Sequence, residues 1–133
     1  MAAAPGSAPA DVTPAPGNVR SRVHEYGGRP YTVAGGRIAH CEFGDQILYV
    51  RDAGGPPRAL TPAGYRYADG AAAADGRTLF IVREDHSKPG DPVNAIVTLD
   101  LDRASAGTVL FDAADFVACP RPGPNGQLAF IAW

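Results

Sequence analysis

The chain has 133 residues, which is enough for one domain and short for two. Its 12 lysines and arginines against 14 aspartates and glutamates give a formal charge of −2, so no basic excess points to a nucleic acid partner. No apolar stretch reaches the roughly 18 residues of a membrane helix. We therefore expect neither nucleic acid nor a membrane among its partners.

Frequent turn residues are the main compositional signal. The chain holds 16 glycines and 13 prolines, and most of them separate short apolar runs. This punctuation is typical of an all-β fold, and no window has a sustained helical period.

Residues 1–18, MAAAPGSAPADVTPAPGN, are rich in alanine and proline. Four prolines would break a helix, so we expect a disordered lead-in. The segment lacks the positive start and continuous apolar core of a secretory signal, and we expect a cytoplasmic protein. The predicted domain is then residues 19–133.

Residues 19–33, VRSRVHEYGGRPYTV, form the most distinctive stretch. The pair Gly27-Gly28 gives the backbone access to positive φ and predicts a sharp turn. His24, Glu25 and Tyr26 are candidate substrate contacts, although we favour the alternative that they form hydrogen bonds to neighbouring backbone within a loop. Glu25 could pair with a substrate ammonium, although we favour a contact with Arg20 or Arg22.

Two segments in the middle of the chain give the clearest strand patterns. Residues 78–83 are almost all apolar, as in a strand buried on both faces, whereas residues 94–101 alternate as in a half-buried strand. A polar loop joins them, which predicts an antiparallel pair. Further strands are expected at residues 31–33, 37–42, 46–52, 59–61, 65–68, 108–111, 116–119 and 127–131. The predicted core comprises Ile38, Leu48, Val50, Leu79, Ile81, Val97, Leu99 and Leu128.

A repeat organises these strands. Similar Gly-x-x-apolar segments begin at Gly36, Gly76 and Gly126, at offsets of 40 and 50 residues. Periods of about 40–50 residues with four short strands each are typical of propeller blades, and a two-sheet sandwich is the alternative. The prediction is an all-β fold, a partial β-propeller of about two and a half antiparallel blades. Because closed propellers have about four to eight blades, we expect missing blades and self-association through an open edge.

The sequence shows no catalytic residue, cofactor motif or metal site that we can assign. No serine lies in a G-x-S-x-G elbow. Asp85, His86 and Ser87 are the three residue types of a catalytic triad, but they are consecutive in a polar loop, whereas a triad needs side chains that converge from separate elements. The three histidines have no metal-ligand spacing. Cys41 and Cys119 are expected to be small buried residues without a disulfide.

Two motifs carry a family resemblance. Residues 22–28, RVHEYGG, with the following YTV, resemble the first-blade region of the prolyl oligopeptidase family of serine peptidases, in its dipeptidyl-aminopeptidase and acylaminoacyl-peptidase branch. Residues 120–130, PRPGPNGQLAF, resemble a blade motif of that family that recurs in TolB-like propellers. In the first motif, Arg29 stands where a third glycine is common. In the second motif, Asn125 replaces an aspartate.

The resemblance implies an N-terminal propeller that limits peptide access to an α/β-hydrolase domain absent from this chain. The partners would then be the peptide substrate, the missing blades and that hydrolase domain. The chain alone is expected to be inactive, because the catalytic residues would lie in the absent domain. The alternatives are a non-enzymatic TolB-like propeller module that binds a protein or ligand, and a truncated product without its own function.

Overall fold

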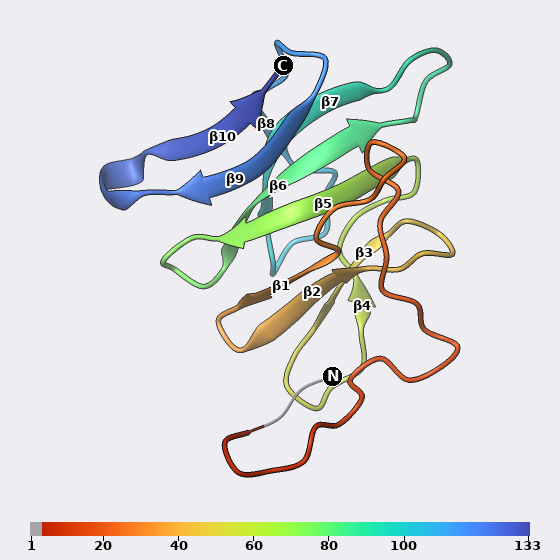
Figure 1. Cartoon of the computed structure of the whole chain (residues 1–133), viewed down its shortest axis with the longest axis vertical. Coiled ribbons are helices and arrows are strands. Elements are labelled where there is room, and N and C mark those ends of the chain that lie inside the picture. Colours follow the sequence, from red (N-terminus) through yellow and green to blue (C-terminus); the bar gives the residue numbers. More distant parts are fainter. Residues whose placement is uncertain (1–3) are drawn as a thin grey trace.

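The structure, a computed structural model, describes residues 4–133 and consists of three antiparallel β-sheets that follow one another along the molecule (Figure 1). The first sheet contains β1 (Tyr31–Ala34), β2 (Arg37–Cys41), β3 (Leu48–Arg51) and β4 (Arg58–Ala59). The second contains β5 (Tyr65–Ala72), β6 (Thr78–Asp85), β7 (Val93–Asp100) and β8 (Thr108–Phe111). The third contains β9 (Val117–Pro122) and β10 (Leu128–Ala132), joined by a 3₁₀ turn over Pro124–Gly126.

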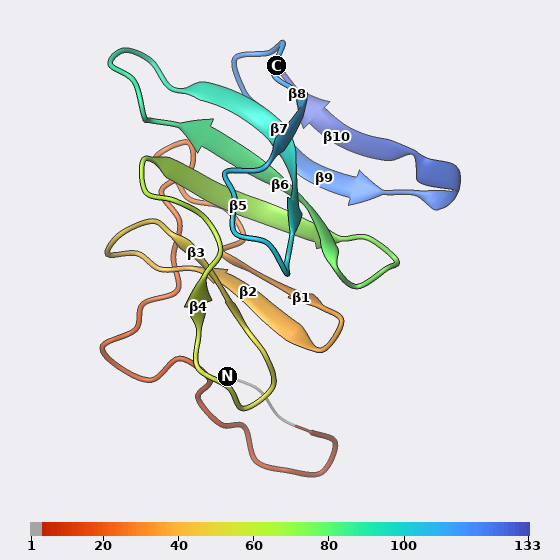
Figure 2. The same ribbon diagram turned by 180° about the vertical axis from the view of Figure 1, so that it is seen from behind.

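Each sheet is a meander in which the strands pair in chain order. Figure 2 shows the same stack from behind, with β8 and β4 at the outer edges of their sheets. Two four-stranded sheets followed by a two-stranded one confirm the predicted partial propeller of about two and a half blades. Pairing in chain order within each four-stranded sheet is the arrangement of propeller blades, and we therefore do not adopt the two-sheet sandwich.

The observed strands lie close to the predicted ones, with one instructive difference. The span 46–52 was predicted as a strand, but β3 begins only at Leu48. Gln46 has a φ of 59°, and the Asp45 carboxylate accepts the N–H of Ile47 at 2.9 Å. This local bond holds a turn where the apolar pattern suggested continuous strand.

Two apolar clusters lie between the sheets. One packs the first sheet against the second and includes Leu48, Val50, Leu79, Ile81, Val97 and Leu99, as predicted. The other lies between the second and third sheets and includes Val82, Ile96 and Val117. Because Ile96 is fully buried there, the prediction of a half-buried strand was wrong: β7 is buried on both faces, like β6.

Two predicted core residues are only partly buried. In β2 the buried face belongs to Ala39 and Cys41, and Ile38 points to the other face, where it lines a groove with Val33. Leu128 packs against the second cluster but lies in a two-stranded sheet that covers it incompletely.

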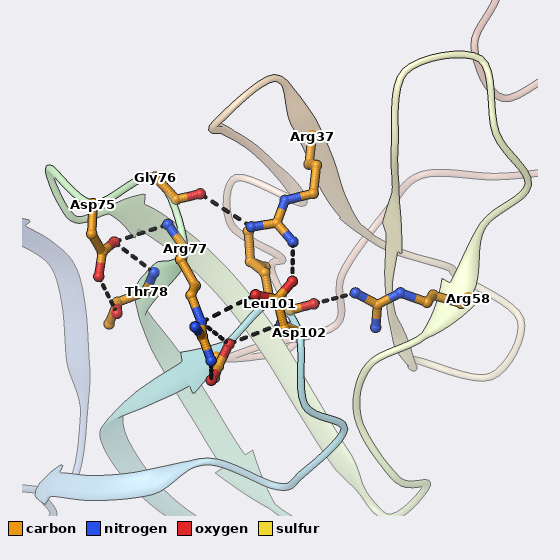
Figure 3. Close-up of polar contacts among 9 residues, drawn as sticks. Arg37, Arg58, Asp75, Gly76, Arg77, Thr78, Leu101 and Asp102 are labelled. Atoms are coloured by element: carbon orange, nitrogen blue, oxygen red, sulfur yellow. Dashed lines mark hydrogen bonds and ion pairs between the residues drawn. The ribbon is translucent and has the colours of Figure 1, made fainter.

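The two complete sheets meet through their turns as well as their faces. The β1–β2 turn approaches the β5–β6 turn so closely that a Cβ added to Gly35 would lie 2.5 Å from the Gly76 carbonyl oxygen. Arg37 of β2 adds polar contacts to the second sheet, because its guanidinium contacts the Asp102 carboxylate at 2.6 Å and the Gly76 carbonyl oxygen at 3.3 Å (Figure 3). Arg58 of β4 also donates to the carbonyl of Leu101, the residue that directly follows β7.

Asp75 and Arg77 shape that second turn from within the sheet (Figure 3). The Asp75 carboxylate accepts the N–H groups of Arg77 and Thr78, each at 2.8 Å, and the Arg77 guanidinium pairs with Asp100 at 2.6 Å. These bonds hold the pKa of the Asp75 and Asp100 carboxyls below their usual values. The Asp-Gly turn predicted from sequence therefore supports an interface between blades.

The remaining sequence predictions concern the cysteines and the first residues. Cys41 is buried, but Cys119 is exposed with a φ of 52°, so its predicted burial was wrong; both are free thiols. The lead-in predicted for residues 1–18 stays a prediction, and residues 1–3 lie outside the described part. The Asn18 N–H donates to the Glu42 carboxylate at 2.9 Å. Within residues 4–133 no helix is long and apolar enough to cross a membrane.

Candidate functional site

The segment His24–Gly27 lies in a tight turn before β1. The Glu25 N–H donates to the Arg22 carbonyl and the Gly27 N–H to the Val23 carbonyl, both at 2.9 Å. Gly27 has a φ of 81°, and a Cβ there would lie 2.8 Å from the Ser21 carbonyl oxygen. The predicted glycine turn is therefore confirmed, and it requires glycine at this position for two separate reasons.

Gly28 has a different role from its neighbour. Its φ is not positive, but an added Cβ would lie 2.9 Å from the Cβ of Ala68 on β5. The next residue, Arg29, exchanges backbone and side-chain bonds with Asp69: its N–H donates to the Asp69 carboxylate at 2.8 Å, and its carbonyl accepts the Asp69 N–H at 2.9 Å. The turn is thus bonded directly to β5, the first strand of the second sheet.

A buried carboxylate, that of Glu84, holds the turn of residues 24–27 in place. Glu84, near the end of β6, is 3% exposed and accepts the His24 N–H at 2.5 Å. Its second oxygen lies 3.0 Å from Nε2 of His86. A carboxylate of this burial requires such partners, and here they link the turn of residues 24–27 to the second sheet over 60 residues of sequence.

Glu25 lies on the outside of the turn and pairs with the second sheet. Its carboxylate contacts the Arg66 guanidinium at 2.5 Å, and its side chain is 75% exposed. The hydrogen bond and charge of Arg66 lower the pKa of the Glu25 carboxyl. The expected pairing with Arg20 or Arg22 is wrong, because both of those guanidinium groups lie over the ring of Phe43 instead.

The other two candidate residues point in different directions. The His24 ring packs edge-on against Phe116, with 5.2 Å between centroids, and lies 6.0 Å from Trp133. Tyr26 is 97% exposed. The structure therefore places Glu25 and Tyr26 on the surface of the turn and His24 within the contact to the third sheet.

Sequence reasoning missed the residues that hold this site. Arg66, Asp69 and Glu84 lie within or beside predicted strands, where the pattern drew attention only to apolar positions. A charged side chain at a position flanked by buried residues, such as Glu84 after Ile81–Arg83, was the available signal. Asp69 has a φ of 58° and lies in a β-bulge, which periodicity does not reveal.

The serine in the neighbouring loop is not activated. The Ser87 hydroxyl donates to Asp85 at 2.5 Å, while the His86 ring contacts Glu84. Ser87 and His86 therefore contact different carboxylates and not each other. Across residues 4–133, no group of three His, Cys, Asp or Glu side chains has an arrangement suited to a metal ion. What the site offers is an exposed carboxylate and phenol on a rigid turn, suited to binding.

Three solved structures are similar to this chain. A puromycin-hydrolyzing peptidase of Mycobacterium tuberculosis is 38% identical over 92% of this chain, with a TM-score of 0.80. A puromycin hydrolase is 34% identical over 90% of the chain, with a TM-score of 0.76. A mutant of puromycin hydrolase complexed with PGG is 35% identical over 90% of the chain, with a TM-score of 0.77.

The match covers most of this chain but only part of each relative. The chain spans 22% of the length of each of these three structures. No protein-family model and no curated protein matches the sequence.

Proposed function

We propose that this chain, whose sequence and fold are those of the N-terminal propeller region of the prolyl oligopeptidase family, is part of the propeller of a serine peptidase. The identity of 34–38% over at least 90% of the chain carries this proposal. The catalytic nucleophile would lie in an α/β-hydrolase domain outside these residues, since no serine of residues 4–133 forms a hydrogen bond with a histidine. The chain would help to bind the peptide substrate and would restrict access to the hydrolase domain.

The proposed role of the propeller is to limit the size of peptides that reach the hydrolase domain. Its blades are packed against one another by two apolar clusters and by contacts between turns. Rigid walls exclude folded proteins and admit short, flexible chains. The enzyme is then expected to hydrolyse short peptides and small amides and to leave folded proteins intact.

The substrates that we propose are short peptides with a free or acylated amino end, as in dipeptidyl-aminopeptidases and acylaminoacyl-peptidases. The two types differ in what the exposed Glu25 would meet. A free ammonium would pair with its carboxylate, whereas an acylated end carries no charge. The relatives named for puromycin hydrolysis add that aminonucleoside amide as a substrate to be tested.

One experiment tests both the activity and the role of the turn. The native enzyme and its Glu25→Gln and Tyr26→Ala variants are assayed on dipeptide anilides with free and acetylated amino ends, and on puromycin. If Glu25 binds the ammonium, Glu25→Gln lowers kcat/KM for free-amino substrates by about tenfold to a hundredfold and leaves acetylated ones unchanged. An equal loss on both substrates means that Glu25 only braces Arg66. Absence of hydrolysis by the native enzyme would refute the function.

We also propose a cytoplasmic location. The two free cysteines, Cys41 and Cys119, suit a reducing compartment. Cell fractionation with an antibody against this chain tests it, and recovery in the secreted fraction would contradict it.

A further inference from the structure

The guanidinium of Arg66 lies between two carboxylates beside the turn of residues 24–27. Its Nη1 atom is 2.5 Å from Oε1 of Glu25 and 3.8 Å from Oε2 of Glu84. The same nitrogen donates to the Arg22 carbonyl at 3.0 Å. Arg66 lies on β5 directly opposite Glu84 on β6, and its side chain is mostly buried. The second sheet therefore fixes the position of this guanidinium.

The two carboxylates differ in whether a ligand can reach them. Glu84 is buried, accepts the His24 N–H and contacts the His86 ring. Glu25 has an exposed side chain on the outside of the turn, and its contact with Arg66 uses one oxygen, Oε1. A molecule bound at this turn would therefore meet the Glu25 carboxylate, with Arg66 fixed behind it.

The charges that face Glu25 keep it ionised. The hydrogen bond and the charge of Arg66 lower the pKa of the Glu25 carboxyl, and the more distant His86 and Arg22 act in the same direction. A molecule that approaches the turn at neutral pH thus meets a negative charge that already has a positive partner.

This partner changes what each kind of amino end gains at Glu25. A substrate ammonium is attracted by the carboxylate but is repelled by the fixed guanidinium of Arg66. An acylated end is neutral and covers the carboxylate without pairing with it. Covering an unpaired carboxylate removes its hydration without compensation, whereas a carboxylate paired with arginine keeps a partner. The ion pair therefore weakens the preference for a free amino end on both counts.

We propose that Arg66 determines how strongly this turn discriminates between free and acylated amino ends of a peptide. By sharing the Glu25 carboxylate, Arg66 lowers the gain from a free ammonium and lets an acylated end bind beside the turn, so that one enzyme accepts both. The inference rests on the proposed function, because it takes peptides to be bound at the turn of residues 24–27.

The test measures one selectivity ratio in the native enzyme and its variants. The substrates are the p-nitroanilide of alanyl-alanine and its N-acetyl derivative, and the ratio is kcat/KM for the free substrate over kcat/KM for the acetylated one. Arg66→Met removes the charge and keeps an aliphatic side chain, whereas Arg66→Lys keeps a positive charge. The matched control is Arg77→Met, which removes a guanidinium that pairs with Asp100 at 2.6 Å beside the opposite end of β6.

We expect Arg66→Met to raise the ratio at least about threefold, since exposed ion pairs shift an equilibrium by up to about fivefold. Arg66→Lys and Arg77→Met should keep the ratio within about twofold of the native value. In a Glu25→Gln background, Arg66→Met should leave the ratio nearly unchanged, because Arg66 acts through Glu25. A purely structural role of Arg66 would instead lower kcat/KM for both substrates by the same factor.

The possible failures are distinguishable. An unchanged or lower ratio in Arg66→Met, with both substrates still hydrolysed, would overturn the inference and leave the proposed function intact. An equal rise in the Glu25→Gln background would also overturn it, because the effect would then not pass through Glu25. Absence of hydrolysis by the native enzyme would refute the proposed function and the inference together. If circular dichroism shows that Arg66→Met is unfolded, the same ratio in Arg66→Gln decides the question.

Discussion

Replacement of Gly35 by alanine tests the contact between the first two blades. Gly35 and Gly36 form the two-residue β1–β2 turn, with φ of 55° and 76°. Alanine at either position pays about 1–2 kcal/mol for the left-handed backbone. Only at Gly35 would the new Cβ meet another blade, 2.5 Å from the Gly76 carbonyl oxygen. Overpacking of this kind adds about 1–3 kcal/mol.

The expected loss of unfolding free energy is therefore about 2–5 kcal/mol for Gly35→Ala and about 1–2 kcal/mol for Gly36→Ala. Gly36 is a matched control, because nothing lies within 4 Å of its added Cβ. The measurement is urea unfolding followed by circular dichroism, comparing midpoints at constant m value. Domains of this size have about 5–15 kcal/mol of stability, so the difference is readily resolved. Equal effects of the two substitutions would refute the close approach of the blades.

Three further predictions follow from single side chains. Glu84→Ala removes the acceptor of the His24 N–H. We expect the free energy of unfolding, measured in urea, to fall by about 1–3 kcal/mol, and the turn of residues 24–27 to be cleaved faster by a protease. An unchanged proteolysis pattern would contradict the role of Glu84 in holding this turn. Cys119 should react with a thiol reagent in the native chain and Cys41 only after unfolding, because Cys41 is fully buried. Burial raises the pKa of the Cys41 thiol from about 9 to about 11, so only the unfolded chain releases this proton between those pH values, and the free energy of unfolding should fall as pH rises from 9 to 11. The Cys41→Ala variant should lose this pH dependence. Trp133 is 59% exposed, so its emission should shift to the blue if the chain self-associates, as sedimentation would show; a monodisperse monomer with a buried Trp133 would be the opposite result.

Local patterns predicted most of the fold. The Asp75-Gly76 turn and the apolar run of β6 depend on neighbouring residues, and both are found close to their predicted bounds. The alternation of residues 94–101 placed β7 correctly along the chain but gave the wrong burial for one of its faces. Repetition of similar turns then predicted blades. The family resemblance of residues 22–28 is confirmed by the similarity to solved peptidase structures.

Contacts between blades were outside the reach of the sequence pattern. Glu25 was expected to pair with an arginine nearby in sequence, but Arg66 approaches it across 41 residues. Ile38 was assigned to the core from its apolar character, and only the register of β2 shows that Ala39 faces the neighbouring sheet. Burial of Ile96 likewise depends on β9, a strand of the next sheet. Such facts depend on how sheets stack, which alternation within one strand does not encode.

The central claim is that these residues are part of a serine peptidase, and labelling of the native protein tests it most directly. An antibody against this chain captures the protein from cells, and a fluorophosphonate probe then labels any activated serine. We expect a labelled polypeptide several times larger than the 13.8 kDa of this chain. A 13.8 kDa polypeptide that takes up no probe would contradict it and would favour a binding module without catalytic activity.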